Sequence, residues 1–340
     1  MSLEQQLVST AEDGHLDLVK NLVEQGVDFH FRDEEALKSA ASNGHLNVVK
    51  YLVEQGADLH AGNEKPLKWA ARGGRLDVVK YLVELGANLH AENEKTLSWA
   101  SSYGHLGVVK YLIGQGADIH VYNEEALRSA ARGGHLDVVK YLVGLGANPH
   151  AGNEYALRWA AENGRLDVVK YLVELGANLH AEDEEALRWT SLFNHFDIVK
   201  YLVEQGANIH AMGEDTLILA VLNDRHDVIK YLVDQGANPQ VILDNSNNYQ
   251  PVVNYVYYLA KVRPIIKKIN DQIEYAPIGR FKSFPQGGVK YQGNSYRILW
   301  TRIGQEIGNA PPGYLKLLPN GSNGYQETKE WIEKEYPENG

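Results

Sequence analysis

The histidines are the residues that most directly suggest chemistry, because imidazole is a common metal ligand and titrates near neutral pH. All thirteen lie before residue 240. Two ligands of one zinc ion must each lie about 2 Å from it, whereas packed helices lie about 8–10 Å apart. Most of them form two series with a common 30-residue register: His30, His60, His90, His120, His150, His180 and His210, and His15, His45, His105, His135 and His195.

Members of one series belong to successive segments of the chain, so they do not share an ion without distortion. We therefore expect no metal site, and we expect these side chains to hydrogen-bond the backbone of turns and helix ends. A weaker alternative is pH sensitivity, because the seven histidines of the first series would charge together at mildly acidic pH.

Carboxylates and nucleophiles form no catalytic constellation. The chain has no cysteine, and residues 241–340 contain no histidine, which excludes a thiol nucleophile throughout and a histidine-based triad in that region. Gly287-Gly288 and the segment from Gly304 to Gly308 match no phosphate-binding loop. Seven glutamates share one register at the start of a predicted helix, where a carboxylate stabilises exposed amide groups: Glu34, Glu64, Glu94, Glu124, Glu154, Glu184 and Glu214. We expect no catalysis and no cofactor.

The elements that must position these side chains follow a fixed period. LNVVKYLVEQGADLH at Leu46 returns in closely similar form every 30 residues, which indicates a repeat array. Within a repeat, Leu37, Ala40 and Ala41 lie at helical spacing, and a second apolar helical stripe starts at Leu46. Glycines follow each stripe, as is typical of helix ends. The pattern predicts two short antiparallel helices per repeat, which bury their apolar faces by stacking on neighbouring repeats.

LKWAARGGRLDVVKYLVELGANLHA, from Leu67 to Ala91, resembles an ankyrin repeat, whose pattern has Leu-x-x-Ala-Ala, Gly-His, Val-Val and Gly-Ala-Asp-x-Asn in this order. The resemblance covers about residues 3–240 in eight copies. The period is 30 residues rather than the family's usual 33, and only Pro66 keeps the proline of the family's Thr-Pro-Leu-His entry. The shortened form is similar to arrays encoded by giant DNA viruses of amoebae. This resemblance implies an all-α solenoid that binds a protein, which would be a host protein if the chain is viral.

Three regions are expected. Residues 1–240 form the array of eight helix-pair repeats, with the first repeat as a polar N-terminal cap. Residues 241–275 form a linker and a capping helix, and residues 276–340 a small α+β module with a β-hairpin, turning near Gly293-Asn294, and a terminal helix. The first helix of the last repeat is apolar nearly all round, so we expect the segment that follows to cover Leu219 and Leu222.

Charge is distributed unevenly along the chain. Residues 1–240 carry 21 Lys and Arg against 35 Asp and Glu, a net charge of −14, and residues 241–340 carry 12 against 9, a net charge of +3. Such an acidic array is a poor general binder of phosphate backbones, so no nucleic-acid partner is expected. The polar start is no secretory signal, and no window is apolar enough to span a membrane. We expect a cytoplasmic protein that is not secreted.

Positions that vary between repeats point to recognition, because scaffolding requires the same residue in every repeat. One such position holds tryptophan in four repeats and serine in others, and basic residues lie beside it. Tryptophan and arginine dominate binding hot spots. Under the alternative interpretation, the tryptophans pack between repeats and the basic residues pair with glutamates of the turns; the two interpretations are compatible. The candidate protein-binding residues are Trp69, Trp99, Trp159, Trp189, Lys68, Arg72, Tyr122, Arg128, Arg132, Tyr155, Arg158 and Arg188.

The sequence therefore favours a non-catalytic, monomeric scaffold or adaptor that binds a protein partner on the concave surface of the array. Two alternatives remain open. In one, the array recruits a substrate to a small C-terminal module that is catalytic or recruits ubiquitin machinery, although no convincing F-box is present. In the other, the chain is a self-associating structural component.

Overall fold

The structure is a computed structural model that describes residues 2–244, 282–283 and 289–290. It divides into two compact parts, Met1–Ile198 and Val199–Gly340, which we call the first and second parts.

The predicted helix pairs are confirmed in the described residues, where each 30-residue repeat contributes a first and a second helix. The first helices are α1 (Leu3–Glu12), α3 (Phe31–Asn43), α5 (Ala61–Arg72), α7 (Ala91–Ser102), α9 (Val121–Gly133), α11 (Ala151–Glu162), α13 (Glu185–Leu192) and α15 (Ala211–Leu222). The second helices are α2 (Leu16–Glu24), α4 (Leu46–Glu54), α6 (Leu76–Glu84), α8 (Leu106–Gly114), α10 (Leu136–Gly144), α12 (Leu166–Glu174), α14 (Phe196–Glu204) and α16 (His226–Asp234).

A short helix, α17 (Gln240–Asp244), follows the last pair. Further along the chain, β1 (Lys282–Ser283) pairs with β2 (Val289–Lys290) in antiparallel register, with Lys282 opposite Lys290. The turn expected at Gly293-Asn294, the capping helix and the terminal helix lie outside the described residues. The three-region division of the chain therefore stays a prediction.

The core of the first part is one continuous row of apolar side chains, in which each repeat supplies the same positions. Leu37, Ala40 and Ala41 of α3 are fully buried, as are Val49 and Leu52 of α4. Burying one such leucine stabilises the fold by about 1.5–3 kcal/mol. Alanines on the first helices let neighbouring backbones approach closely, and first helices of successive repeats contact one another more extensively than second helices do.

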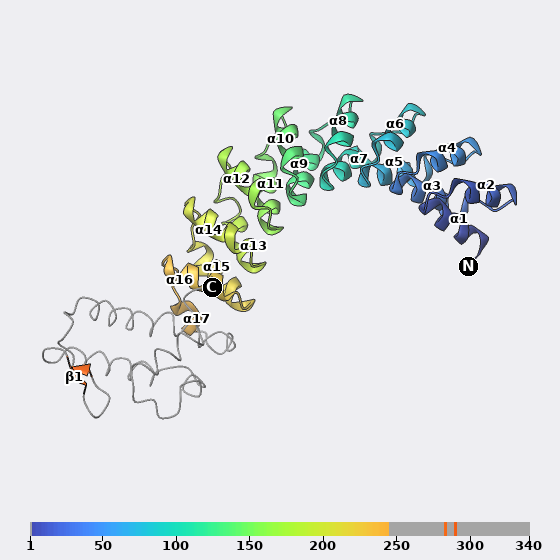
Figure 1. The fold of residues 1–340 in the computed structure, drawn as a ribbon. Coiled ribbons are helices and arrows are strands. Elements are labelled where there is room, and N and C mark those ends of the chain that lie inside the picture. The colour runs from blue at the N-terminus through green and yellow to red at the C-terminus, as the bar shows by residue number, and fades with distance from the viewer. Residues whose placement is uncertain (1, 245–281, 284–288, 291–340) are drawn as a thin grey trace. The chain divides into compact units, whose positions relative to one another are not determined.

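This difference in packing curves the stack within the first part. In Figure 1 the first helices α5, α7, α9 and α11 lie along the inner side of the curve, and the second helices α6, α8, α10 and α12 lie along its outer side. We call the surface formed by α5, α7, α9, α11, α13 and the turns before them the first-helix face. The surface formed by α2, α4, α6, α8, α10 and α12 is the second-helix face.

At or just before the start of each first helix after α1, three consecutive residues have left-handed backbone angles. The sequence patterns did not reveal this feature. At Arg32, Asp33 and Glu34 the φ angles are 51°, 59° and 63°. Left-handed helical backbone costs about 1–2 kcal/mol per non-glycine residue. Asparagine, aspartate or glycine occupies the middle position of every triplet, and these types tolerate the conformation best. The triplets are Arg32 to Glu34, Gly62 to Glu64, Glu92 to Glu94, Tyr122 to Glu124, Gly152 to Glu154, Glu182 to Glu184 and Met212 to Glu214.

The glutamate that ends each triplet is buried, which corrects the expectation of a carboxylate near exposed amides of its own helix. Its partner is the histidine four residues earlier: Nδ1 of His60 lies 2.6 Å from Oε1 of Glu64, and Nδ1 of His120 lies 2.8 Å from Oε1 of Glu124. Glu34 also accepts a hydrogen bond from the backbone N–H of Asp58, in the turn that follows α4, at 3.1 Å. These contacts offset part of the strain of the left-handed triplet.

The two histidine series therefore have different partners. In the second series, Nε2 of His45 donates to the carbonyl oxygen of Glu12 at 2.8 Å, and Nε2 of His105 donates to that of Arg72 at 2.8 Å. The prediction of backbone hydrogen bonds is confirmed for His45, His105, His135 and His195, and the bonds join successive repeats. Arginine takes the histidine's place in three repeats, and Nε of Arg75 donates to the carbonyl oxygen of Ser42 at 2.9 Å. For the first series the prediction is wrong, because its ring partner is a glutamate carboxylate.

In the second part, Leu217 and Ala220 of α15 and Ile229 and Leu232 of α16 are buried. Leu219 is half-buried, and Leu222 is 58% exposed. The segment expected to cover these two leucines continues beyond Asp244, outside the described residues, so that expectation stays a prediction. An apolar first helix is compatible with one exposed leucine because single surface leucines are ordinary.

Candidate binding surface

The twelve candidate residues all lie on the first-helix face. Trp69, Lys68 and Arg72 belong to α5 and Trp99 belongs to α7. The remaining residues are carried by α9, α11 and α13: Tyr122, Arg128 and Arg132 by α9, Tyr155, Arg158 and Trp159 by α11, and Arg188 and Trp189 by α13. Their side chains lie on one side of the first part because each first helix presents the same positions to that side.

One aromatic cluster joins α5 and α7. The rings of Trp69 and Trp99 meet edge to face, with centroids 5.9 Å apart and an angle of 79° between their planes. The guanidinium carbon of Arg72 lies 4.8 Å from the centroid of Trp69 and 6.0 Å from that of Trp99. It also lies 5.0 Å from the ring of Tyr103, whose hydroxyl accepts a hydrogen bond from Nε of Arg72 at 3.0 Å. We call Trp69, Arg72, Trp99 and Tyr103 the first cluster.

A second cluster joins α9 and α11. The guanidinium carbon of Arg128 lies 5.0 Å from the ring of Tyr155 and 5.1 Å from that of Trp159, and that of Arg132 lies 5.8 Å from Trp159. A terminal nitrogen of Arg128 donates to the carbonyl oxygen of Tyr122 at 2.8 Å. We call Arg128, Arg132, Tyr155 and Trp159 the second cluster. Each cation–π contact contributes about 0.5–1 kcal/mol at an exposed site.

Trp189 has a different neighbour. Its ring stacks on Phe193 with centroids 5.8 Å apart. Phe193 and Tyr103 are both exposed aromatic residues that the sequence analysis did not select. They occupy one register, two residues before the second helix's histidine, where other repeats hold Asn43, Gly73 or Gly133. The same variation between repeats that identified the tryptophans would have identified them.

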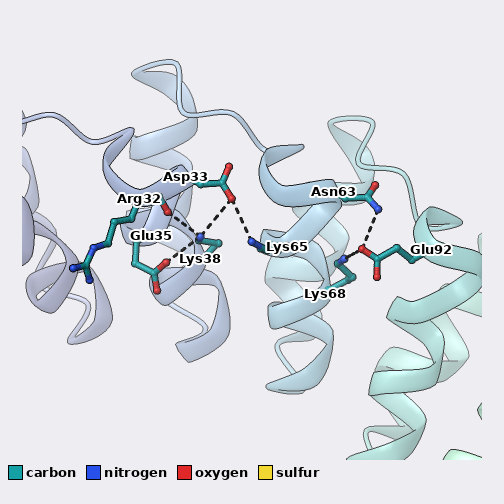
Figure 2. Close-up of polar contacts among 8 residues, drawn as sticks. All are labelled: Arg32, Asp33, Glu35, Lys38, Asn63, Lys65, Lys68 and Glu92. Atoms are coloured by element: carbon teal, nitrogen blue, oxygen red, sulfur yellow. Dashed lines mark hydrogen bonds and ion pairs between the residues drawn. The ribbon is translucent and has the colours of Figure 1, made fainter.

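Other basic residues pair with acids of the neighbouring repeat, as the alternative interpretation predicted. Nζ of Lys68 lies 2.6 Å from Oε1 of Glu92, which also accepts a hydrogen bond from Asn63 at 3.0 Å (Figure 2). The hydrogen bond from Lys68 is the main reason that the pKa of Glu92 lies below its ordinary value. Lys38 of α3 pairs with Asp33 and Glu35 of its own repeat, and Lys65 reaches Asp33 from the next repeat (Figure 2).

Arg158 also joins two repeats, through an ion pair with Glu185. Burial raises the pKa of Glu185, but hydrogen bonds from Arg158 and Trp189 outweigh that effect, and the pKa lies below its ordinary value. Lys68 and Arg158 are only 4% and 9% exposed. These two candidate residues therefore hold adjacent repeats together, whereas Arg72 and Arg132 are more accessible.

Within residues 2–244 and the two short strands, no group of three or more histidine, aspartate or glutamate side chains is arranged to hold a metal ion. No helix of this described part is long and apolar enough to cross a membrane.

Comparison with protein families agrees with the fold. A family model of ankyrin repeats matches the chain in three copies, over residues 7–93, 97–183 and 179–242. The chain therefore belongs to the ankyrin-repeat family. Proteins built from ankyrin repeats generally act as protein–protein interaction modules and are typically non-enzymatic scaffolds. A search of curated proteins finds no match to this chain.

Proposed function

We propose that the chain is a non-catalytic adaptor that binds a protein partner on the first-helix face of its first part. The observation that carries the proposal is the pair of aromatic–arginine clusters, both partly exposed on that face. Tryptophan, tyrosine and arginine supply most of the binding energy in protein interfaces when they lie close together. Their mutual ring contacts fix the side chains before a partner arrives, which lowers the entropy lost on binding.

The repeats also provide the length that a protein partner needs. Packed helices lie about 8–10 Å apart, so the four steps from α5 to α13 extend over about 30–40 Å. A surface of this extent accommodates an extended segment or one side of a small domain. The resemblance of the 30-residue repeats to arrays of giant DNA viruses supports a host protein as the partner.

The test is affinity capture with the immobilised full-length chain, comparing the wild type with Trp99→Ser/Trp159→Ser. Serine is compatible with this position because Ser39 and Ser129 occupy it in other repeats. Lys110→Gln/Lys140→Gln, on the second-helix face, is the matched control. We expect proteins that bind the wild type and the control but are lost from the tryptophan variant, whose circular dichroism and melting temperature stay close to wild type. Unchanged recovery contradicts the proposal, and unfolding of the tryptophan variant shows that the two rings serve packing instead.

A further inference from the structure

Two groups of basic residues can be distinguished on the first helices. Lys38, Lys68 and Arg158 are buried and paired with carboxylates of the same or the next repeat. Arg72, Arg128 and Arg132 make no ion pair with any residue that the structure describes, and each lies against aromatic rings instead. Arg72, Arg128 and Arg132 therefore carry positive charges that no described carboxylate pairs with.

The rings determine which part of each guanidinium remains available. A guanidinium is planar, and aromatic rings stack against its face while its N–H donors point outward from its edge. Around Arg72 three rings lie within 6.0 Å of the guanidinium carbon, and only Nε is occupied, by the hydroxyl of Tyr103. The terminal N–H groups match the two oxygens of a carboxylate, which arginine binds through two parallel hydrogen bonds.

The distance between the clusters limits the shape of the ligand. Arg72 and Arg132 occupy the same register two repeats apart. Two steps of about 8–10 Å place them about 16–20 Å apart, and an extended chain rises about 3.3 Å per residue, so about five or six residues cover this distance. Ser129 holds the tryptophan position in the repeat that carries Arg132, so a small side chain lies between Trp99 and Trp159 in the series.

We infer that the first-helix face binds an extended acidic segment of its partner, with two carboxylate side chains about five or six residues apart, one at Arg72 and the other at Arg128 and Arg132. This inference depends on the proposed function and names the class of partner. The net charge of −14 on residues 1–240 opposes an acidic ligand at long range. At physiological ionic strength charges are screened beyond about 8 Å, so the local arginines determine binding at contact.

The test uses a random library of 12-residue peptides displayed on phage and selected on the full-length chain. Selected peptides are synthesised and titrated by calorimetry against the wild type and Arg72→Gln/Arg132→Gln. Lys110→Gln/Lys140→Gln removes the same charge from the second-helix face and is the matched control. Arg132→Gln alone alters an exposed residue, so it keeps the test interpretable if the double variant does not fold.

We expect enrichment of two acidic residues at the stated spacing, with affinity at least about tenfold lower for Arg72→Gln/Arg132→Gln and changed less than about twofold for the control. Replacing both acids of the peptide by glutamine is expected to cause the same loss. Peptides that bind without acidic residues, are insensitive to the arginine changes and lose affinity for Trp99→Ser/Trp159→Ser overturn the inference while leaving the proposed function standing. If no selected peptide depends on either set of substitutions, both are overturned.

Discussion

The two faces of the first part are built from the same repeats but differ in regularity. On the second-helix face, a lysine in each of the first five repeats lies over a tyrosine ring of the next repeat, and this contact recurs with little change. The distances from Nζ to the ring centroid lie between 5.3 and 5.9 Å for the pairs Lys20–Tyr51, Lys50–Tyr81, Lys80–Tyr111, Lys110–Tyr141 and Lys140–Tyr171. On the first-helix face, the histidine–glutamate contact of the turns also recurs, but the side chains of the helices vary: serine replaces tryptophan at Ser39 and Ser129, and the basic residues change their partners from repeat to repeat.

The regular lysine–tyrosine contacts join successive repeats, and the more variable first-helix face is the one on which we propose that a partner binds. The lysine side chains of the second helices reach across to tyrosine rings of the next repeat. Partial burial raises the pKa of Tyr51, Tyr81 and Tyr111, and the charges of Glu24, Glu54 and Glu84 raise it further. These tyrosines therefore stay protonated and neutral as they pack between repeats.

The largest expected effect is a loss of stability when two tyrosines of the second-helix face are replaced. Tyr111→Ala/Tyr141→Ala removes two half-buried rings and their lysine contacts, and we expect the free energy of unfolding to fall by about 2–4 kcal/mol. Urea denaturation measures this change. Affinity for a partner should be unaffected, and a large loss of affinity in a variant that is still folded would show that recognition is not confined to the first-helix face.

The complementary experiment changes the first-helix face. For Trp159→Ser we expect a captured partner to bind more weakly by about 2 kcal/mol or more, because the ring supports Arg128 and Arg132. The free energy of unfolding should fall by less than about 1 kcal/mol, since the ring is half-buried and its register accepts serine elsewhere. Calorimetric titration and urea denaturation of the same preparation separate the two effects. A loss of stability larger than the loss of affinity would assign Trp159 to packing.

A smaller effect on stability is expected from changing a left-handed triplet at the start of a first helix. Arg32 has a φ of 51°, and its register holds Gly62 and Gly152 in other repeats. Arg32→Gly is expected to stabilise the fold by up to about 1 kcal/mol by relieving backbone strain. Arg32→Val should destabilise it, because a branched side chain is least tolerant of this conformation. Thermal unfolding of both variants gives the sign, and equal effects would refute a left-handed backbone at this turn.

The smallest effect concerns pH. The hydrogen bond to Glu124, together with its negative charge, raises the pKa of His120 above 6.5. The folded state then binds the proton more tightly than the unfolded state, so this stabilisation is complete below the unfolded pKa and is lost as pH rises through the folded pKa. We expect a slightly higher melting temperature at about pH 6 than at about pH 8. In Glu124→Gln, the part of this pH dependence that comes from His120 should disappear. If the difference in melting temperature between about pH 6 and about pH 8 is the same as in the wild type, other groups cause it.

The sequence was sufficient for the helices and for placing the twelve candidate residues on one face, because the 30-residue period fixes which side chains share a face. The left-handed triplets were not predictable, since three consecutive residues such as Tyr122, Asn123 and Glu124 adopt this backbone only when the surrounding repeats compensate for its cost. The His120–Glu124 contact depends on that turn and was missed with it. Contacts such as Lys80–Tyr111 were missed because they depend on the stagger between repeats, which periodicity alone does not give.

The central claim is that a partner binds to the first-helix face, and hydrogen–deuterium exchange of the full-length chain with and without a bound peptide or captured partner tests it most directly. We predict slower exchange on binding in residues 61–74 and 121–134, which contain α5 with Arg72 and α9 with Arg128 and Arg132. Residues 76–86 and 106–116 of the second-helix face should be unchanged. Slower exchange confined to the second helices, or to residues outside 2–244, would contradict the account.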